Sequence, residues 1–584
     1  MSKFNTTKPS MAVIEDSIDP QESAELQEAF GIAPDILNYE KAPAYQYSDK
    51  LNLATRALTS LMSEERFYET AEKSDDEIIR LFEKVLKEDP EFAKGLLLSL
   101  RKDFHLRSIS HVLAAELARQ QATDTADIIA EICERPDDML EILAYYTKKY
   151  GDKKLPNSIK KGLAKAFAKF NEYQLAKYNS KGKVWLRDIL RIAHPKPANK
   201  EQAELWGRVT TDTLKTPETW EVKISQNGST KENWSEMIDS DKMGYMAILR
   251  NLRNFLKKDV PMEEVIKVAN ILKDPERIKK SKQLPFRFFS AYRALKAELG
   301  LGEPRRYDDY YYNYQYQQDE GGVNLCKAEV LFDALEEAAK IAVQNLPKLD
   351  GKTVIACDVS GSMERRISPR SSVERFDIGM ILGALANRFS DDTTIGIFGD
   401  TWREIEVDKN RPLASALEMH RWEGEVGYST HGYQVIKALL ESRRKVDRIL
   451  FFTDCQMYGN DFDDPPNESG SEDDCLSCYK LDDSDPETSK SIGQFIREYR
   501  EQINADLKLY FFDLAGYGNC SIPEQDPQTL IIGGWSEKLF EFIPTFENGQ
   551  SKTEFLDKLK NKYLKWKAKR SIKANEPKAE KKAA

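Results

Sequence analysis

The first half of the chain repeats one pattern, in which apolar residues recur at intervals of three and four among polar ones. Residues 77–86 show this pattern clearly, and it stops at Asp89-Pro90. It returns at 92–100, 109–119, 125–133, 139–149, 158–170, 184–193, 243–256, 262–272 and 286–299. Such a period places the apolar side chains on one face of an α-helix. Helices joined by short turns are the unit of an α-solenoid, so we predict a HEAT-like helical repeat domain over residues 41–345.

We find no strong strand signal before residue 350, and beyond it the period changes. Short apolar runs rich in β-branched residues lie at 353–357, 394–398, 448–452, 507–513 and 529–532, with a shorter one near 404–407. Helical patterns at 376–389, 433–440, 491–502 and 536–543 alternate with them. This alternation predicts a doubly wound sheet over residues 346–550. The expected fold class is therefore α + α/β.

Four segments fall outside these two patterns. Residues 1–40 are expected to form a loosely ordered arm, and the Tyr-rich tract 301–322 a loop or linker. Its tyrosines could stack on bases, but packing as an ordinary linker is the simpler interpretation. Residues 460–487 carry 11 Asp/Glu against one Lys and are expected to be a mobile insertion. The lone pair Cys475 and Cys478 within it is weak evidence for zinc.

The last segment, 551–584, is predicted to be a basic helix followed by a disordered tail from residue 571. Leu556, Leu559, Tyr563 and Trp566 recur at helical spacing within it. A stripe of this kind generally docks on the protein's own core.

Composition narrows the class of protein. The hydrophobic content is 40% and the charged content 32%, with no apolar run near the roughly 20 residues that cross a bilayer. The amino terminus lacks the apolar core of a secretory signal. The seven Cys residues are an odd number and few for this length, which argues against a disulfide framework. We therefore expect a cytoplasmic protein without a membrane partner, and a monomer.

Oxygen ligands gather at the ends of two predicted strands. Asp358, Ser360 and Ser362 follow the strand 353–357, and Asp454 follows the strand 448–452. Thr430 lies in the turn before the helix 433–440. Carboxyl ends of parallel strands share one sheet edge, and carboxylate and hydroxyl oxygens suit Mg²⁺ or another divalent cation. The alternative is a solvated turn that caps the next helix.

This set resembles the metal-ion-dependent adhesion site (MIDAS) of von Willebrand factor A domains. The resemblance implies that Ser360, Ser362 and Thr430 touch the metal. It implies that Asp358 and Asp454 bind through water and that one position is left for an oxygen of a partner, such as a protein carboxylate.

The net charge of −10 hides a basic region. Residues 141–200 carry 15 Lys/Arg against 4 Asp/Glu. Lys177, Lys181, Lys183, Arg187, Arg191 and Lys196 offer several phosphate contacts within about twenty residues, which indicates a polyanion partner. His194 and Trp185 could contact a base, although Trp185 could equally be core and His194 a helix cap. Arg250 and Arg253 share a helix face and could bind RNA or pair with acids of a neighbouring helix.

Three stretches, 178–197, 243–254 and 284–292, are more specific. They include Leu190-Arg191-Ile192-Ala193-His194-Pro195-Lys196-Pro197 and Arg250-Asn251-Leu252, and Gly533–Ser536 accompanies them. With a carboxy-terminal A domain, they resemble the TROVE module of the Ro autoantigen family and its bacterial relatives. The resemblance spans residues 40–545. Some members carry His where this chain has Leu186, which weakens the implied Y-RNA recognition.

The resemblance implies both a fold and a function. In that family HEAT repeats curve into a ring closed by the A domain. The hole accepts single-stranded ends of misfolded RNAs, and the outer basic surface binds small noncoding Y RNAs. Some bacterial relatives tether a 3′ exoribonuclease through such an RNA.

The sequence offers little support for catalysis. It has no Walker loop, no dinucleotide fingerprint and no Cys/His or Ser/His pairing near a predicted pocket. We therefore expect no enzyme activity. The leading interpretation is an RNA-binding ring protein that acts in RNA quality control or as a ribonucleoprotein scaffold. The alternative is a metal-dependent protein-interaction scaffold.

Overall fold

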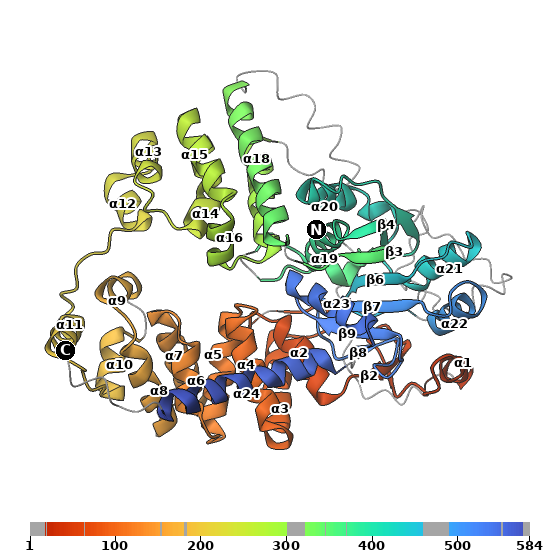
Figure 1. Cartoon of the computed structure of the whole chain (residues 1–584), viewed down its shortest axis with the longest axis horizontal. Coiled ribbons are helices and arrows are strands. Elements are labelled where there is room, and N and C mark those ends of the chain that lie inside the picture. Colours follow the sequence, from red (N-terminus) through yellow and green to blue (C-terminus); the bar gives the residue numbers. More distant parts are fainter. Residues whose placement is uncertain are drawn as a thin grey trace, which may run out of the picture. The chain divides into compact units, whose positions relative to one another are not determined.

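The structure is a computed structural model that describes residue 18 and residues 20–575, except 64, 152–154, 180–183, 301–321, 345, 369–370, 459–489 and 550–552. Its elements can be followed in Figure 1. The chain divides into two compact units. We call residues 60–64, 71–268 and 553–584 the helical unit, and residues 1–59, 65–70 and 269–552 the sheet unit.

The helical unit is built from short helices in chain order. They are α3 (Ala71–Glu88), α4 (Pro90–Lys102), α5 (Arg107–Arg119), α6 (Thr125–Ile132), α7 (Pro136–Tyr150), α8 (Asn157–Phe167), α9 (Glu172–Tyr178), α10 (Leu186–Ala193), α11 (Lys200–Thr211), α12 (Trp220–Asn227), α13 (Lys231–Asp239) and α14 (Tyr245–Lys257). From α3 to α8, each helix packs on the next but one, and most also pack on the next, as α4 does on α5 and α6. Contact between sequence neighbours is the hallmark of a solenoid, so the repeat pattern is confirmed.

Turn residues explain where these helices begin. Asp89 caps α4 by accepting a hydrogen bond from the backbone N–H of Phe92, and Pro90 occupies the first turn. Asn199 and Thr230 cap α11 and α13 in the same way. A polar cap oxygen satisfies a backbone donor that has no partner inside the helix. The caps, rather than the apolar period alone, therefore set the helix boundaries.

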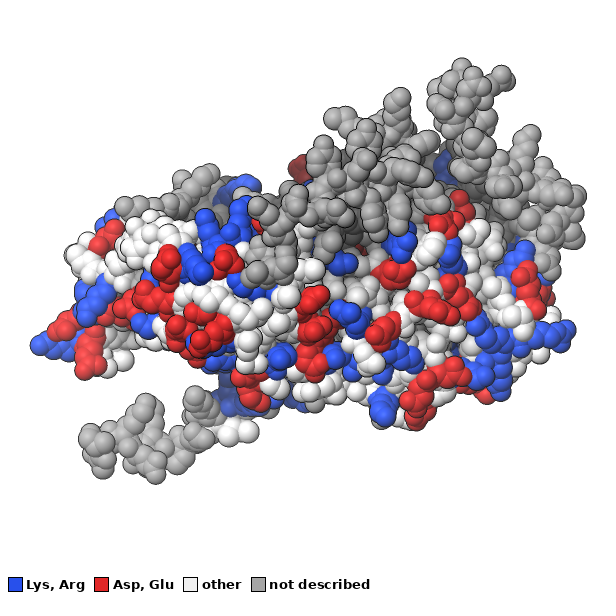
Figure 2. Space-filling model, turned by 90° about the horizontal axis from the view of Figure 1, so that it is seen from above, with Lys and Arg blue, Asp and Glu red and all other residues white. Residues whose placement is uncertain are grey.

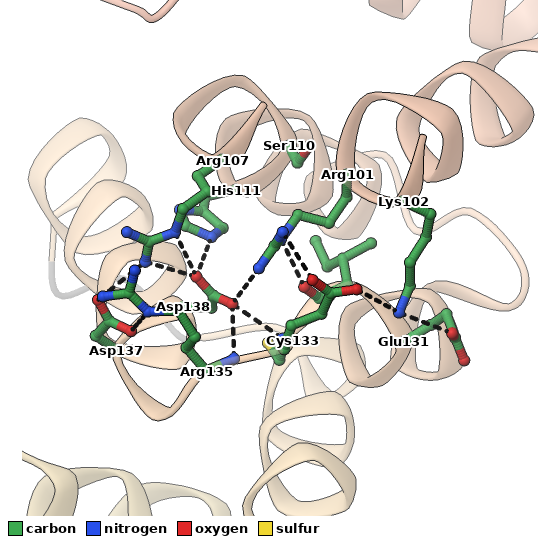
Figure 3. A network of polar contacts seen from close by, with 12 residues as sticks. Arg101, Lys102, Arg107, Ser110, His111, Glu131, Cys133, Arg135, Asp137 and Asp138 are labelled. Atoms are coloured by element: carbon green, nitrogen blue, oxygen red, sulfur yellow. Dashed lines mark hydrogen bonds and ion pairs between the residues drawn. The ribbon is translucent and has the colours of Figure 1, made fainter. Parts of the chain in front are cut away.

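A buried ion-pair network ties α4, α5 and α7 together (Figure 3). The Asp138 carboxylate accepts hydrogen bonds from Arg101 at 3.0 Å and from Arg107 at 2.7 Å, and contacts Nε2 of His111 at 3.0 Å. Burial alone would raise the pKa of Asp138, but His111 and the two arginines outweigh it and hold that pKa well below its usual range. The network fixes the relative placement of α4, α5 and α7.

The sheet unit contains a six-stranded sheet in the order β5-β4-β3-β6-β7-β9. Its strands are β3 (Leu349–Asp358), β4 (Ser390–Phe398), β5 (Trp402–Glu404), β6 (Arg448–Thr453), β7 (Lys508–Asp513) and β9 (Thr529–Gly533). All neighbours pair in parallel except β4 and β5. Every residue of β6 is buried, as expected for a strand covered on both faces.

Helices surround this sheet. They are α18 (Gly322–Ala342), α19 (Arg375–Ala386), α20 (Pro412–Arg421), α21 (Tyr433–Glu441), α22 (Ile492–Gln502) and α23 (Phe542–Glu547), with 3₁₀ turns η3 (Gly361–Glu364), η4 (Glu423–Glu425) and η5 (Glu537–Glu541). The helices α16 (Pro275–Ser281) and α17 (Pro285–Glu298) pack on α18, so they belong to this unit, while α15 (Met262–Leu272) spans the division. The fold class α + α/β is confirmed, although the compact units do not divide at residue 346.

The amino-terminal region differs from the expected loose arm of residues 1–40. The helix α1 (Pro20–Phe30) packs on α22, with Leu26 buried. The strands β1 (Ile36–Leu37), β2 (Pro43–Gln46) and β8 (Asn519–Cys520) form a small antiparallel sheet, and α2 (Asp49–Leu58) packs on β9. These strands lie before residue 350, where the sequence shows no strong strand signal. A two-residue or four-residue strand is too short to show a period.

The carboxy-terminal helix α24 (Glu554–Asn575) runs along α4 in the helical unit (Figure 1). Leu559 and Tyr563 of the predicted stripe are buried, so its docking on the protein's own core is confirmed. The helix continues to Asn575, so residues 571–575 are helical, and the rest of the expected tail lies outside the described residues. The Tyr-rich loop 301–322 and the acidic insertion 460–487 with Cys475 and Cys478 lie almost entirely outside the described residues.

Candidate metal centre and RNA-binding surface

The loop after β3 carries the first oxygen ligands. The Asp358 carboxylate accepts the backbone N–H of Ser360 at 2.9 Å, which turns the chain sharply into η3. Oγ of Ser360 then lies 3.2 Å from Oγ of Ser362. All three side chains are buried, with exposed fractions of at most 4%. The loop thus presents two adjacent hydroxyls beside a buried carboxylate.

The loop before α21 lies against this turn. The backbone N–H of Gly361 donates to the carbonyl of Tyr428 at 2.9 Å. Thr430, two residues further on, is buried, and its carbonyl accepts the N–H of Tyr458 from the loop after β6. The three loops that carry the predicted ligands are therefore joined at the carboxyl edge of the sheet.

Asp454 completes the set at the end of β6. Its Oδ1 accepts the backbone N–H of Gln456 at 3.0 Å, whereas its Oδ2 is buried without a hydrogen-bond partner among the described residues. Burial and the nearby charge of Asp454 raise the pKa of Asp358 to about 7, and burial also raises the pKa of Asp454. Two buried carboxylates that repel each other are the setting in which a bound cation is most favourable.

Two further residues shape this site, and sequence analysis missed both. The hydroxyl of Thr453 donates to Oδ2 of Asp358 at 2.5 Å. The buried guanidinium of Arg375, the first residue of α19, lowers the pKa of Asp454 through its charge. Thr453 could have been found from its place at the strand end. Nothing in the sequence indicates that Arg375 approaches Asp454, because the two lie far apart along the chain.

The residues present fit a hard divalent cation. The donor set contains only oxygen, as Mg²⁺ prefers. It consists of two carboxylates, one with an oxygen that has no partner in the described part of the chain, and two hydroxyls 3.2 Å apart. Within the described ranges, no group of three or more His, Cys, Asp or Glu side chains is placed to hold a metal. The candidate site therefore depends on its Ser and Thr hydroxyls.

The predicted RNA-binding residues separate into two groups in the helical unit. Lys177 at the end of α9, and Arg191, His194 and Lys196 at and beyond the end of α10, are all exposed. His194 ends α10 in a left-handed conformation (φ 44°), and its N–H donates to the carbonyl of Leu190, as a helix cap does. Lys181 and Lys183 lie outside the described residues.

Arg187 differs from its neighbours because it is half-buried. Its guanidinium stacks on the ring of Trp185, with 4.1 Å between the guanidinium carbon and the ring centroid. Its Nε has no hydrogen-bond partner among the described residues. Trp185 is itself only partly buried, so the pair offers a planar cationic surface of the kind that stacks on a base.

Arg250 and Arg253 form the second group. Both are exposed on α14, one helical turn apart, whereas Asn251 and Leu252 between them are buried. The alternation follows from the helical period and places both guanidinium groups on the solvent face. The helices α11 to α13 separate them from α10 along the chain.

Charges elsewhere are mixed. Figure 2 shows one face on which Lys and Arg side chains are interspersed with Asp and Glu over the described surface. Across the described residues many charged side chains form ion pairs, such as Arg208–Glu172 and Lys165–Asp127. The exposed basic residues at the ends of α9 and α10 lie on a protein whose net charge is −10.

The fold and site define a helical-repeat protein joined to a doubly wound α/β domain with an oxygen-lined sheet edge. A family model, the TROVE domain, matches residues 45–213 and 209–351, together more than half of the chain. The chain therefore belongs to the TROVE domain family.

Two kinds of relative support this assignment. The chain is 24% identical to telomerase protein component 1 of Mus musculus over 328 residues, and 25% identical to that of Rattus norvegicus over 292 residues. These matches cover 42% and 35% of this chain but only 12% and 11% of the rodent proteins. The crystal structure of the RO (RSR) protein of Deinococcus radiodurans matches the fold with a TM-score of 0.51 and 18% identity. That match covers 86% of this chain and all of the RO chain.

Within the described residues, no helix is long and apolar enough to span a membrane.

Proposed function

We propose that this protein binds RNA through its helical unit and acts in RNA quality control or as a ribonucleoprotein scaffold. The exposed basic group at the ends of α9 and α10 supports the proposal most strongly. Lys177, Arg191, His194 and Lys196 face solvent on a chain whose net charge is −10. A cluster of exposed cationic side chains on an otherwise acidic protein favours the binding of a polyanion at that cluster.

The TROVE family assignment directs the proposal toward RNA rather than another polyanion. The expected ligands are a small noncoding RNA of the Y type and the single-stranded ends of structured or misfolded RNAs. The stacked pair of Arg187 and Trp185 suits a single-stranded base, and the exposed lysines suit the phosphate backbone. The protein would act by binding rather than catalysis, as a cytoplasmic monomer, and a 3′ exoribonuclease could join it through the RNA.

The test is crosslinking and RNA sequencing on the purified protein beside Lys177→Ala/Arg191→Ala/Lys196→Ala. We expect a defined small RNA with the wild type and its loss in the variant. A matched control neutralises the exposed lysines Lys41, Lys348 and Lys445 of the sheet unit. RNA enrichment no greater than background in the wild type would refute the proposal. If both variants retain the RNA equally, the RNA-binding site lies elsewhere than at the ends of α9 and α10.

We propose further that Asp358, Ser360, Ser362, Thr430 and Asp454 hold Mg²⁺. Support comes from Oδ2 of Asp454, which has no hydrogen-bond partner among the described residues, and from the buried carboxylate pair. When bound, the cation would neutralise the two carboxylates and offer a coordination position to an anionic oxygen.

A second candidate function follows from this centre. A metal with an open position could capture a carboxylate of a protein partner, and the protein would then serve as an interaction scaffold. Partners that elute with EDTA but resist ribonuclease would support the scaffold, whereas partners released by ribonuclease alone would support the RNA function. The two functions are compatible, because they use different surfaces.

A further inference from the structure

The carboxy-terminal helix α24 is fastened to the helical unit along one face. Phe555, Leu559 and Tyr563 are buried there, with exposed fractions of at most 3%. The approach is close, because a Cβ atom at Gly95 of α4 would lie 2.1 Å from the carbonyl oxygen of Leu559. The matched TROVE residues end at 351, so this helix lies outside the family match.

Lys and Arg side chains at the edge of the docked face of α24 form ion pairs with Asp side chains of the helical unit. Lys560 pairs with Asp89 at 3.1 Å, Lys562 pairs with Asp103, and Arg570 pairs with Asp127 at 2.7 Å. The hydroxyl of Tyr563 donates to Asp124 at 2.6 Å. The helix carries eight Lys or Arg and two Asp or Glu, so docking leaves a surplus of positive charge.

That surplus lies on the solvent face. Lys565 and Lys569 are exposed and one helical turn apart, about 6 Å along the axis at the α-helical rise. Within the described part of the chain, neither has a hydrogen bond or an ion pair. Lys558 lies two turns earlier on the same face and is also exposed. Docking thus separates the lysines that hold the helix from those that face outward.

The helix α8 extends this surface. Asp127 of α6 pairs with both Arg570 of α24 and Lys165 of α8, so it links the end of α24 to α8. Lys161 lies one turn before Lys165, is exposed, and has no ion pair within the described residues. We refer to Lys161, Lys565 and Lys569 as the α24 ridge.

We propose that the α24 ridge is a second RNA contact of the helical unit and binds the phosphate backbone without reading sequence. The ridge rests on the proposed RNA function and extends it to a region outside the TROVE match. Lysine ammonium groups on a rigid helix suit phosphates as point charges, and no aromatic ring or Arg in the ridge is available to read a base. RNA is favoured over an acidic protein because the ridge belongs to the same unit as α9 and α10.

The test compares Lys161→Gln/Lys565→Gln/Lys569→Gln with the wild type by fluorescence anisotropy. The probes are a labelled single-stranded oligouridine and a labelled RNA hairpin. Binding is measured between about 50 and 200 mM salt, where log K falls by about 0.7 per phosphate contact for each unit of log[salt] on single strands. We expect the slope for the triple variant to be shallower by about 2 on oligouridine. The control variant Lys41→Gln/Lys348→Gln/Lys445→Gln should keep the wild-type slope.

The outcomes separate the two proposals. An unchanged slope and affinity in the ridge variant, with a wild type that binds both probes, would overturn the ridge and leave the RNA function intact. No binding of either probe by the wild type would overturn both. A loss of polyglutamate binding as large as the loss of RNA binding would reassign the ridge to acidic proteins. All three side chains face solvent, so α24 should remain docked in the ridge variant. Far-ultraviolet circular dichroism and thermal unfolding check that it does.

Discussion

The hydroxyl of Thr453 donates a 2.5 Å hydrogen bond to Oδ2 of Asp358. This bond joins the ends of neighbouring parallel strands β3 and β6 at the centre of the candidate metal site. It also holds the first carboxylate in place before any cation arrives. Preorganisation of this kind is what a metal site of few ligands requires.

We therefore expect Thr453→Val, which preserves shape, to destabilise the protein. The substitution leaves a buried carboxylate oxygen without its donor, at a cost of about 1.5–3 kcal/mol. Urea unfolding monitored by intrinsic fluorescence measures this loss. Thr545→Val is the matched control, since that hydroxyl bonds an exposed backbone carbonyl. If the two substitutions lower the free energy of unfolding equally, the Thr453–Asp358 hydrogen bond stabilises the fold no more than an exposed one does.

Magnesium should stabilise the sheet unit. A ligand that binds only the folded state adds about 2.7 kcal/mol at a concentration one hundred times its Kd. Thermal unfolding with Mg²⁺ and with EDTA should therefore give a higher Tm in Mg²⁺. Asp454→Asn removes one of the two charges and should abolish most of the difference. A Tm that is the same in Mg²⁺ and EDTA for the wild type would contradict the metal assignment.

Asp138 should be the costliest single carboxylate to remove from the helical unit. Asp138→Asn leaves the buried His111 without its carboxylate partner and leaves Arg101 with Glu134 as its remaining acid, and breaking a buried pair in this way costs about 3–5 kcal/mol. The exposed pair Arg80–Glu77 provides the control, because Glu77→Gln should change stability by less than about 1 kcal/mol.

The same carboxylate predicts a pH dependence. The pKa of Asp138 is lower in the folded protein than in the unfolded chain, where it is about 3.9. Ionised Asp138 therefore stabilises the fold fully above about pH 4, and this stabilisation is lost as the pH falls toward the folded value. The stability difference between wild type and Asp138→Asn should be constant from pH 7 to about pH 5 and shrink below pH 4. A difference that grows on acidification would contradict the network's role.

The contact between α4 and α24 offers a steric test. Gly95→Ala places a methyl group against the backbone of Leu559 and should cost about 1–3 kcal/mol through overpacking. Gly207 in α11 has open space around its Cβ position, so Gly207→Ala should instead stabilise the helix by up to about 1 kcal/mol. Limited proteolysis of the carboxy terminus reports whether α24 has detached. A Gly95→Ala variant as stable as Gly207→Ala would show that the helices can move apart freely.

Much of the fold follows from local pattern. The period of three and four residues located most of the helices between α3 and α17, because an amphipathic helix must place its apolar residues at that spacing. The order of buried strands and helices likewise indicated the doubly wound sheet. Asp358, Ser360 and Ser362 could be selected from the sequence because they follow a buried strand directly and lie within five residues of one another.

Other features depend on residues that meet only after folding. The charge of Arg375 acts on Asp454 across a separation of about eighty residues, and no local pattern encodes such an approach. The small sheet of β1, β2 and β8 joins segments from opposite ends of the chain, and its strands are too short to show a period.

The basic carboxy-terminal segment shows the division most clearly. The sequence by itself indicated a helix up to residue 570 with an apolar stripe and an excess of lysine, which the structure extends to Asn575. Only the tertiary structure decided which cations are neutralised. The acids that pair with Lys560, Lys562 and Arg570 come from the cap before α4, the turn after α4 and α6. The net charge of a chain follows from its sequence alone. The charge that it exposes on its surface depends on which acidic side chains folding places beside each lysine or arginine.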